Sequence, residues 1–590
     1  MTFLAEIPIE VLLDNFLPWL AIPDLLHLGS TNRFFTSLCN DETFWKRKLQ
    51  ADFNYSDEST ARISGWKLIY KGLSRPRSFV WGESSKGRLG LNKFPRSNIG
   101  DVPFPTELHI ARGVRIVSLS AAGMSFFALD SEGRVYVWGT LDGTSFALLG
   151  DGYNEAGQKA MTPLKLKLPS ATRSISCGRL HATTLDENSD VWIFLSWGHP
   201  FRLCSPYLDK SSEDTTPLQV TSGWRFSAVL TMSGNVLIWR PFDNEIQERV
   251  AVENGQMTDL GIKILAVDDI IQCKTWDLTT SPFRLPEVPR LPPLGGASAD
   301  EPVQIIKIAA LENGLIGLTN QGHVLKFSVT GGLQAAHERW EYLPNFSEIE
   351  KIKDHTAYAS DLKPPRTLRI THISAQYRTF VAYSPGPESV VLMGSGDAHE
   401  HFQPTILPTL QNKDIISVVL GDYHFGALTS TGKLLTWGAY SRGALGLGDP
   451  TKIEPGEPGG YRTEQIRSTA ASNGGPYPTE VRDPSEVTFD HGEKTKRKRF
   501  CFAATAAGWH MGALVIDLEP DTDEKVDNEE DTRPIPGQFP ASQQPGPSSG
   551  YPQEPGRWGF PFSPSTSIFR VGFAGRGAQR GGNRGSGRGS

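Results

Sequence analysis

The chain has 590 residues, of which 65 are acidic and 59 basic, and it contains 59 glycines, 42 prolines and five cysteines. This length exceeds one ordinary compact domain, and the high share of glycine and proline argues against an all-helical protein and favours strands joined by many turns. The formal net charge of −6 excludes a duplex-DNA binder whose whole surface is basic, although a local basic segment stays compatible with it.

The five cysteines are widely scattered and include no Cys-x-x-Cys pair. They indicate neither a disulfide framework nor a thiolate zinc site, so we expect a reducing compartment, the cytoplasm or the nucleus or both. The apolar stretch at residues 3–28 lacks a basic leader and carries Glu6, Glu10 and Asp14, which argues against export. No run of residues reaches the roughly 18 to 20 apolar positions of a spanning helix, and we expect a soluble protein without a membrane partner.

The first 50 residues have the spacing of short helices. Pro8 and Pro23 stand where helices would begin, because the missing N–H of proline costs nothing in a first turn. We expect a small all-α domain over residues 1–50 and a junction over residues 51–78. The apolar residues at helical spacing are Ile7, Val11 and Leu12, then Leu13, Phe16, Leu17 and Leu20.

The order of short motifs in this segment is similar to the F-box. These motifs are Ile7-Pro-Ile-Glu-Val-Leu12, Leu17-Pro-Trp-Leu20, Pro23-Asp-Leu-Leu26, Ser30-Thr-Asn-Arg-Phe-Phe35 and Asp41-Glu-Thr-Phe-Trp45. Ile7 stands where the family usually has leucine, a conservative departure. The resemblance implies docking on a Skp-type adaptor, which ties an F-box protein to a cullin scaffold. Carried over by position, the adaptor-binding residues would be Ile7, Pro8, Val11, Leu12, Leu20 and Leu25.

A physical argument supports part of this interpretation. So few residues cannot enclose every apolar side chain that they carry, and some of these side chains should remain available to a partner helix. The alternative is that this apolar surface docks on the rest of the same chain. We expect Trp45, Trp66 and Tyr70 to form the internal junction between the helices and the strands that follow.

An octet that ends in leucine or tyrosine recurs along residues 79–518, at a spacing typical of a β-propeller rather than of a helical solenoid. A second strand rich in β-branched and aromatic residues follows most copies. Four octets are followed by Leu-x-x-x-Gly, which places a glycine where a hairpin turn needs positive φ: Gly133, Gly234, Gly322 and Gly432. The seven octets begin at Ala122, Gly178, Gly223, Leu311, Gln376, Gly421 and Ala507.

The two ends of this array complement each other. Residues 79–82 resemble the strand that follows an octet, but no octet precedes them. The octet at residues 507–514, in turn, is not followed by such a strand. If these segments pair, the array closes into a ring and leaves no exposed sheet edge at its ends. A further recurring element, Pro-x-x-aliphatic, predicts strand starts at Pro105, Pro163, Pro217, Pro302, Pro365, Pro404 and Pro478.

Two glycine-rich segments, Trp81-GESSK-Gly87-RL-Gly90 and Trp437-GAYSR-Gly443-AL-Gly446, share one spacing. With Gly178-RL-His181 and Gly421-DY-His424 they resemble the regulator of chromosome condensation repeat. The resemblance covers about residues 79–518 and implies a mainly β fold, a seven-bladed propeller. It is degenerate in the third to fifth units, so blade boundaries between residues 240 and 390 stay open.

Three excursions interrupt the array, at residues 241–300, 331–364 and 448–500, and we expect them to be disordered or used for binding. Residues 519–590 begin with an acidic run and continue in proline, glycine, serine and glutamine, a composition that predicts a disordered tail. The tail ends in an Arg-Gly segment. Its spaced guanidiniums could hold RNA weakly, the alternative being a solubilising role: Arg576, Arg580, Arg584 and Arg588.

No constellation of catalytic residues emerges. Asp397, His399 and His401 have no established zinc spacing and are better explained as a surface loop. The glycines at residues 443–448 lack the lysine and the strand-turn-helix context of a phosphate loop. We therefore expect no catalytic site, no metal and no cofactor. The scattered histidines are explained by repeat positions: His181, His424 and His510.

Together the two parts resemble a substrate-recognition subunit of a Skp/cullin/F-box ubiquitin ligase, with a protein substrate held on the propeller for degradation. Such a receptor contributes proximity, and its partners carry out the bond chemistry. Two alternatives stay open. One is a guanine-nucleotide exchange factor for a Ran-like GTPase, which the propeller's namesake family includes, and the other is a chromatin or RNA scaffold that uses the Arg-Gly tail.

Overall fold

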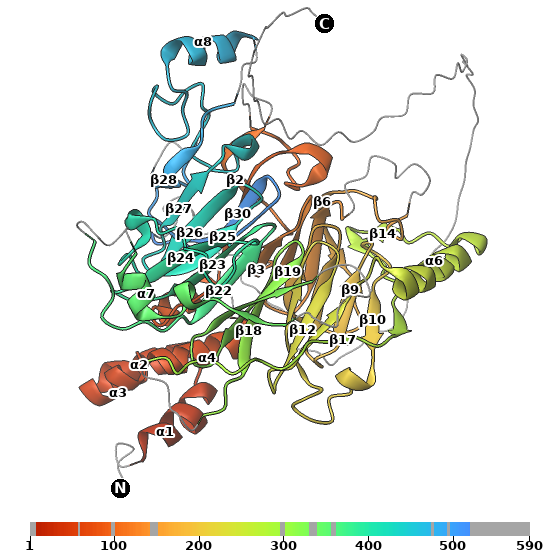
Figure 1. Ribbon diagram of the computed structural model, residues 1–590, viewed down its shortest axis with the longest axis horizontal. Helices are drawn as coiled ribbons and strands as arrows, with labels where there is room; N and C mark the ends of the chain where they lie inside the picture. Colours follow the sequence, from red (N-terminus) through yellow and green to blue (C-terminus); the bar gives the residue numbers. More distant parts are fainter. Residues whose placement is uncertain are drawn as a thin grey trace, which may run out of the picture. The chain divides into compact units, whose positions relative to one another are not determined.

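The computed structural model describes residues 7–56, 60–95, 101–111, 113–141, 152–295, 301–329, 339–355, 362–473, 477–491 and 496–519. Across these residues the strands form seven separate sheets, which are the blades of a β-propeller (Figure 1). A group of helices precedes the first strand in the chain. The predicted fold class, a mainly β seven-bladed propeller with a small helical N-terminal part, is confirmed.

The blades are described from the innermost strand outward. The first contains β3 (Ile116–Ala121), β4 (Ser125–Asp130), β5 (Val135–Gly139) and β6 (Ala160–Leu166). The second contains β7 (Thr172–Cys177), β8 (Ala182–Asp186), β9 (Val191–Phe194) and β10 (Phe201–Cys204), and the third β11 (Pro217–Ser222), β12 (Ser227–Thr231) and β13 (Val236–Trp239). The fourth contains β18 (Ile305–Ala310), β19 (Gly314–Thr319), β20 (Val324–Ser328) and β21 (Glu341–Tyr342).

The fifth blade contains β22 (His372–Gln376), β23 (Thr379–Ser384) and β24 (Val390–Ser395), and the sixth β25 (Ile415–Leu420), β26 (His424–Thr429), β27 (Leu434–Gly438) and β28 (Val481–Glu486). The seventh blade combines both ends of the array: β29 (Arg499–Ala507) and β30 (His510–Asp517) come from its end, and β1 (Arg77–Gly82) and β2 (Val102–Leu108) from its beginning.

The join in the seventh blade is an antiparallel pairing of β1 with β30. Phe79 lies opposite Ala513, and Trp81 lies opposite Met511. This is the pairing that the unmatched strand and the unmatched octet predict, and it is confirmed. Because the join is made by hydrogen bonds inside a sheet, neither end of the array presents a free strand edge there.

Each octet contains the second strand of a blade and the turn that leads into it, and the strand predicted to follow the octet is the third. The turn glycines Gly133 and Gly432 have φ of 76° and 82°, a region that L-residues with a Cβ rarely adopt. The last residue of the octet is apolar because it fills the space between blades. All seven of these side chains are buried: Leu129, Leu185, Leu230, Leu318, Tyr383, Leu428 and Leu514.

Packing between neighbouring blades explains the shared spacing of the two glycine-rich segments. The indole Nε1 of Trp81 donates a hydrogen bond of 2.8 Å to the carbonyl of Ala444. A Cβ at Gly446 would collide with the ring of Trp81, and a Cβ at Gly90 would collide with Trp138. The loop after the third strand of one blade thus packs on the tryptophan of the next blade, and only glycine leaves room for that ring.

The expectation of disorder is wrong for the described residues of the excursions. These residues form helices and strands, and several of the strands extend the outer edges of blades. Between residues 241 and 300 the chain forms α6 (Asn244–Asp259), β14 (Ala266–Val267), β15 (Ile270–Ile271), β16 (Trp276–Thr279) and β17 (Phe283–Arg284). Strand β15 pairs with β6, β16 with β10 and β17 with β13. An outer strand offers unpaired backbone groups that a neighbouring segment can satisfy.

The other two excursions are also structured where they are described. They contain η7 (Pro344–Phe346), α7 (Ile349–Lys353) and α8 (Glu464–Asn473) in addition to β21 and β28. Residues 296–300, 330–338, 356–361, 474–476 and 492–495 lie outside the described residues.

The interpretation of Pro-x-x-aliphatic as a strand start is correct only for Pro217, the first residue of β11. Pro105 and Pro163 lie inside the outer strands β2 and β6, at irregularities in the pairing with the next strand. Proline has no N–H to donate, and a bulge in a peripheral strand tolerates that loss. The remaining four lie outside the named strands: Pro302, Pro365, Pro404 and Pro478.

The N-terminal helices form a small module. Asn32 accepts a hydrogen bond of 3.0 Å from the backbone N–H of Phe35, and Asp41 accepts one of 2.8 Å from Phe44, so both side chains cap helices. The helical segments are α1 (Ile9–Val11), η2 (Leu12–Phe16), η3 (Leu17–Trp19), α2 (Ile22–Thr31), α3 (Arg33–Leu38), α4 (Glu42–Phe53) and α5 (Trp66–Gly72). Pro8 precedes the first helix and Pro23 lies in the first turn of α2, as predicted.

Residues 54–72 attach the module to the propeller. Asn54 Nδ2 donates to the carbonyl of Thr172 at 2.9 Å, and the N–H of Ala61 donates to Ile416 at 2.6 Å. Arg62 donates to the carbonyl of Ser430 at 3.3 Å, and its guanidinium lies over the ring of Phe500, 5.2 Å from the centroid. The propeller groups are all at the starts of inner strands or in the hairpin turns between second and third strands. We call this side of the propeller the hairpin face.

The predicted junction residues lie in this region. Trp45 and Trp66 are buried, and the rings of Trp45 and Tyr70 meet edge to face at 5.0 Å. A Cβ at Gly72, in α5, would collide with Ile516 of β30, so the last helix of the module packs directly on the closing blade. The aromatic cluster therefore connects α4 and α5 to the join of the ring.

Replacing Leu514 with alanine tests the closure. The side chain is fully buried in β30, so we expect a loss of about 2–5 kcal/mol in the free energy of unfolding. The whole array should respond as one unit in urea unfolding followed by both circular dichroism and tryptophan fluorescence. The control is Leu518→Ala, an exposed side chain just beyond β30, expected to change stability by less than about 0.5 kcal/mol. Loss of a single blade with the others unaffected would contradict closure.

Candidate functional site

The first 20 residues of the helical module leave large apolar side chains in contact with solvent. Leu12, Leu17 and Leu25 form the inside of the module and are fully buried. We call the exposed set the apolar surface of the module. Its members and their exposed fractions are Ile7 (36%), Ile9 (46%), Val11 (44%), Trp19 (86%) and Leu26 (48%). A tryptophan that exposed is unfavourable unless a partner covers it, because its ring contributes most where it is buried.

The six residues predicted to bind an adaptor fall into two groups. Ile7, Pro8 and Val11 are exposed, and Leu20 is half-buried. Leu12 and Leu25 are fully buried, so they hold the module together and present no surface to a partner in this conformation. Their replacement would test the stability of the module rather than its binding.

Three exposed residues were not among those predicted, namely Ile9, Trp19 and Leu26. All three lie within the quoted motifs, Trp19 in Leu17-Pro-Trp-Leu20. Sequence spacing identifies which residues share a helical face, but the short π and 3-10 turns at residues 12–19 rotate that face away from the ideal α-helical pattern.

The alternative that this apolar surface docks on the rest of the chain is not what the described residues show. The propeller contacts come from Phe53 and from the described residues of the segment that follows it, 54–56 and 60–72, and the apolar surface stays accessible. Two separate parts of the helical segment thus serve two purposes. One attaches the module to the propeller, and the other is free for a second polypeptide.

The opposite ends of the inner strands carry a second candidate site. Here the first three residues of each octet lie at the turn between the first and second strands, with Gln376 and Ala507 still in β22 and β29, and we call these seven turns the turn ring. Their backbones follow one another around the propeller axis. The N–H of Glu312 donates to Tyr377 at 2.6 Å, and the N–H of Asp422 donates to Gly508 at 3.2 Å. A Cβ at Gly178 would collide with the carbonyl of Gly223, and one at Gly508 with that of Gly123.

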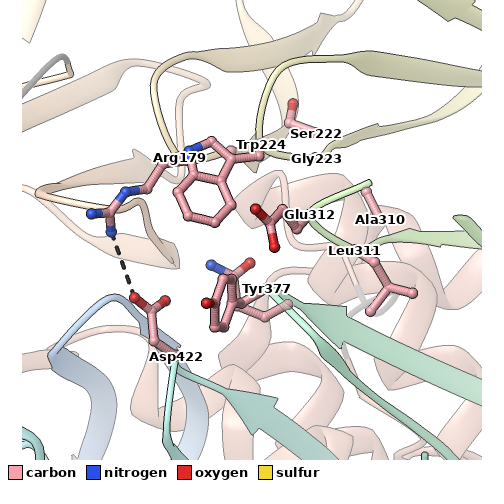
Figure 2. A pocket seen from close by; sticks show the side chains of 11 residues that line it. Arg179, Ser222, Gly223, Trp224, Ala310, Leu311, Glu312, Tyr377 and Asp422 are labelled. Atoms are coloured by element: carbon pink, nitrogen blue, oxygen red, sulfur yellow. Dashed lines mark ion pairs between the residues drawn. The ribbon is translucent and has the colours of Figure 1, made fainter. Parts of the chain in front are cut away.

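Side chains of the turn ring enclose a small hollow (Figure 2). The guanidinium of Arg179 lies 3.6 Å from a carboxylate oxygen of Asp422 and over the ring of Trp224, 5.4 Å from its centroid. The rings of Trp224 and Tyr377 meet edge to face at 5.4 Å. Glu312 lies to one side of these two rings in the view of Figure 2. The site therefore combines charged groups and aromatic faces drawn from blades two to six.

Histidines at the fourth position of the octets lie buried behind the turn ring. His181 Nε2 lies 2.9 Å from the hydroxyl of Ser227 in the next blade. Burial lowers the pKa of His181 and that of His424 to about 4, and it places the pKa of His510 well below its usual value. These rings are neutral at physiological pH and connect neighbouring blades, which agrees with their interpretation as repeat positions.

The propeller axis contains a cavity of about 320 Å³ lined mainly by small side chains of the inner strands. Tyr55 and Ser56, from the segment after α4, line the same cavity. Because Asn54 is bonded at the start of β7, these two residues lie at the hairpin face. The junction thus lies at the end of the cavity opposite the turn ring.

Elsewhere the described part of the chain offers little further chemistry. Among the residues that the structure describes, no group of three His, Cys, Asp or Glu side chains could hold a metal ion. The rings of His399 and His401 lie 6.3 Å apart in a loop after β24. All five cysteines are free thiols. None of the described helices has the length and hydrophobicity to cross a bilayer. Outside the described residues lie the four arginines of the tail, Arg576, Arg580, Arg584 and Arg588.

Comparison with known proteins supports an RCC1-like propeller. No family model matches the chain. Protein pim1 of Schizosaccharomyces pombe is 23% identical over 423 residues, which are 66% of this chain and 71% of that protein. The RCC1-like G exchanging factor-like protein of Mus musculus is 25% identical over 454 residues, 68% of this chain and 88% of that protein.

A third relative is SCF-associated factor 1 of Saccharomyces cerevisiae, 21% identical over 351 residues. The match covers 58% of this chain and 42% of that protein. Among solved structures, the crystal structure of Prp20p from Saccharomyces cerevisiae aligns with 75% of this chain at 16% identity and a TM-score of 0.45.

The buried histidines predict an acid-sensitive fold. Between pH 6.5 and 4 the unfolded chain protonates His181 and the folded protein does not, so the free energy of unfolding falls as the pH is lowered through this window. His181→Gln can keep a hydrogen bond to Ser227 and should remove about 1 kcal/mol of the loss between pH 7 and 5.5. Urea unfolding at pH 7 and at pH 5.5 measures this difference in the free energy of unfolding. The exposed His401→Gln serves as control, and a pH dependence equal in both variants would contradict the assignment.

Proposed function

We propose that this protein is a substrate-recognition subunit of a Skp/cullin/F-box ubiquitin ligase. The helical module would bind the Skp-type adaptor through its apolar surface. The propeller would hold a protein substrate for ubiquitin-dependent degradation, in the cytoplasm or the nucleus. The protein would carry out no bond chemistry itself.

The apolar surface of the module is the observation that carries this proposal. Five large apolar side chains are exposed within residues 7–26, and Trp19 alone is 86% exposed. Large apolar side chains that stay exposed within one short segment are typical of sites of protein association, and a tryptophan is a frequent anchor of such interfaces. The order of F-box-like motifs over the same residues supports an adaptor as the partner. The similarity to SCF-associated factor 1 points in the same direction.

The attachment of the helical module and the turn ring lie at opposite ends of the inner strands. Residues 54–72 join the module to the hairpin face through hydrogen bonds and a buried arginine, Arg62, whereas the turn ring lies at the other end. An adaptor and a substrate could therefore be bound at the same time without competing for one surface. Holding both on one scaffold raises the effective concentration of substrate beside the ligase, which is the contribution of a receptor.

The exchange-factor alternative is supported by relatives whose names describe that activity, and their similarity to this chain concerns the propeller. It predicts accelerated release of labelled GDP from a Ran-like GTPase. The scaffold alternative depends on residues 570–590, and it predicts that removing them abolishes nucleic-acid binding in a chain that never bound an adaptor.

Substituting the apolar surface tests the proposed function. Trp19→Ala should lower capture of a purified Skp-type adaptor and cullin at least tenfold, because it removes a central anchor from the interface. Val11→Asp should do the same by placing a charge there. The matched controls are Trp509→Ala, an exposed tryptophan of the turn ring, and Val252→Asp, an exposed valine of α6. Both should keep full adaptor binding. Undiminished capture by Trp19→Ala and Val11→Asp would refute the adaptor role.

A further inference from the structure

The hollow in the turn ring contains more negative than positive charge. Two carboxylates, those of Glu312 and Asp422, line it together with one guanidinium, that of Arg179. Arg179 and Asp422 are already paired with each other at 3.6 Å. No hydrogen bond or ion pair of the Glu312 carboxylate is found within the described part of the chain. Its charge is the one in the hollow without a close partner.

The surroundings of Glu312 are partly dry. The side chain is half-buried, and burial raises its pKa, while the positive charge of Arg378, which lines an adjoining pocket together with Glu312, acts in the opposite direction. Arg378 itself pairs with Asp397 at 3.4 Å. A carboxylate that has lost water without gaining a partner favours the approach of a cation.

Aromatic rings lie beside the same carboxylate. Trp224 and Tyr377 are next to Glu312 in Figure 2, and Tyr423 continues the row with its ring 5.8 Å from that of Tyr377. The face of Trp224 already holds a guanidinium of this chain, that of Arg179. Aromatic faces attract cations through their quadrupole, most strongly where water is excluded. A carboxylate beside aromatic rings has the chemistry that receives a lysine or arginine side chain.

We propose that the turn ring recognises its substrate through a basic side chain, an arginine or lysine of an extended protein segment, whose charge lies against Glu312 beside Trp224 and Tyr377. This proposal names the chemical group by which the substrate is recognised. It rests on the proposed function only in calling the bound protein a substrate. Arg or Lys is the expected occupant because the charge that remains to be balanced in the hollow is negative.

An acidic or phosphorylated segment is disfavoured by the same contacts. The three arginines of the turn ring each face a carboxylate of this chain: Arg179 faces Asp422, Arg225 faces Asp243 at 3.7 Å, and Arg378 faces Asp397. A bound anion at any of these arginines would lie close to the carboxylate that the arginine already faces and would be repelled by it. A cation at Glu312 displaces nothing.

The hollow comes from the blades that depart most from the repeat. Trp224, Glu312 and Tyr377 belong to the third, fourth and fifth octets, where the Gly-x-x-His pattern is lost. At these positions the repeat requires the backbone of a turn. The side chains are not fixed by that requirement and can differ from one blade to another. Their divergence is therefore compatible with a binding role specific to this chain.

The test uses fluorescein-labelled peptides and the purified full chain. The probe is Gly-Ser-Arg-Gly-Ser-Arg-Gly-Ser, compared by fluorescence anisotropy with versions that carry citrulline or glutamate in place of arginine. We expect the arginine peptide to bind at least tenfold more tightly than the citrulline peptide, which has the same shape without the charge. Glu312→Gln should reduce this ratio to below about twofold, and Glu312→Arg should make the glutamate peptide the best ligand.

The control variant is Glu213→Gln, an exposed carboxylate in the loop before β11, which should keep the tenfold ratio because it removes the same charge from another surface. Equal binding of the arginine and citrulline peptides, tighter binding of the glutamate peptide by the native chain, or a ratio that survives Glu312→Gln would each overturn the inference. Circular dichroism confirms that the variants fold.

Adaptor capture by the same preparations separates this inference from the proposed function. A chain that captures the adaptor without preferring arginine keeps the receptor role and loses the recognition chemistry. If the chain prefers the arginine peptide and captures no adaptor, the recognition chemistry of the hollow stands and the ligase role is refuted. The Trp19→Ala variant should show the arginine preference unchanged.

Discussion

The pairing of β1 with β30 is the interaction on which the rest of this structure depends. It brings together segments more than 400 positions apart and turns a linear array of sheets into a closed ring. Only in a closed ring do seven separate turns meet around one axis, so the turn ring and its hollow follow from that pairing. The loss of exposed strand edges at the ends of the array is a further consequence.

The helical module divides its apolar side chains between two environments. Leu12, Leu17 and Leu25 make a small interior, while Ile9 and Trp19 face solvent. A segment of this size has too little volume to enclose all of them. Its attachment through residues 54–72 leaves the apolar surface unoccupied and the turn ring at the far end of the inner strands. A receptor needs this separation, since two partners must be held at once and neither should block the other.

Departures from the repeat carry information of two kinds. The insertion after the third blade adds strands to the edges of three blades, because unpaired backbone groups there accept a neighbour. The degenerate octets alter side chains in the turn ring while their backbones keep the geometry of the other blades. The backbone is constrained by contact with the neighbouring turns, as at Gly178 and Gly508, whereas the side chains that point into the hollow are not. The candidate site therefore lies where the repeat is least regular.

The amino-acid sequence alone determined the fold class, the number of blades and the way the ring closes, because these follow from local periodicity and from the matching of an unpaired strand with an unpaired octet. It also determined that residues 7–45 are helical and rich in apolar side chains. Only the tertiary structure decided which of those side chains are accessible, since Leu12 and Val11 look alike in a pattern and differ in what packs over them. It alone placed Trp224, Glu312 and Tyr377 around one hollow, because residues so distant in the chain become neighbours only when consecutive blades pack against one another.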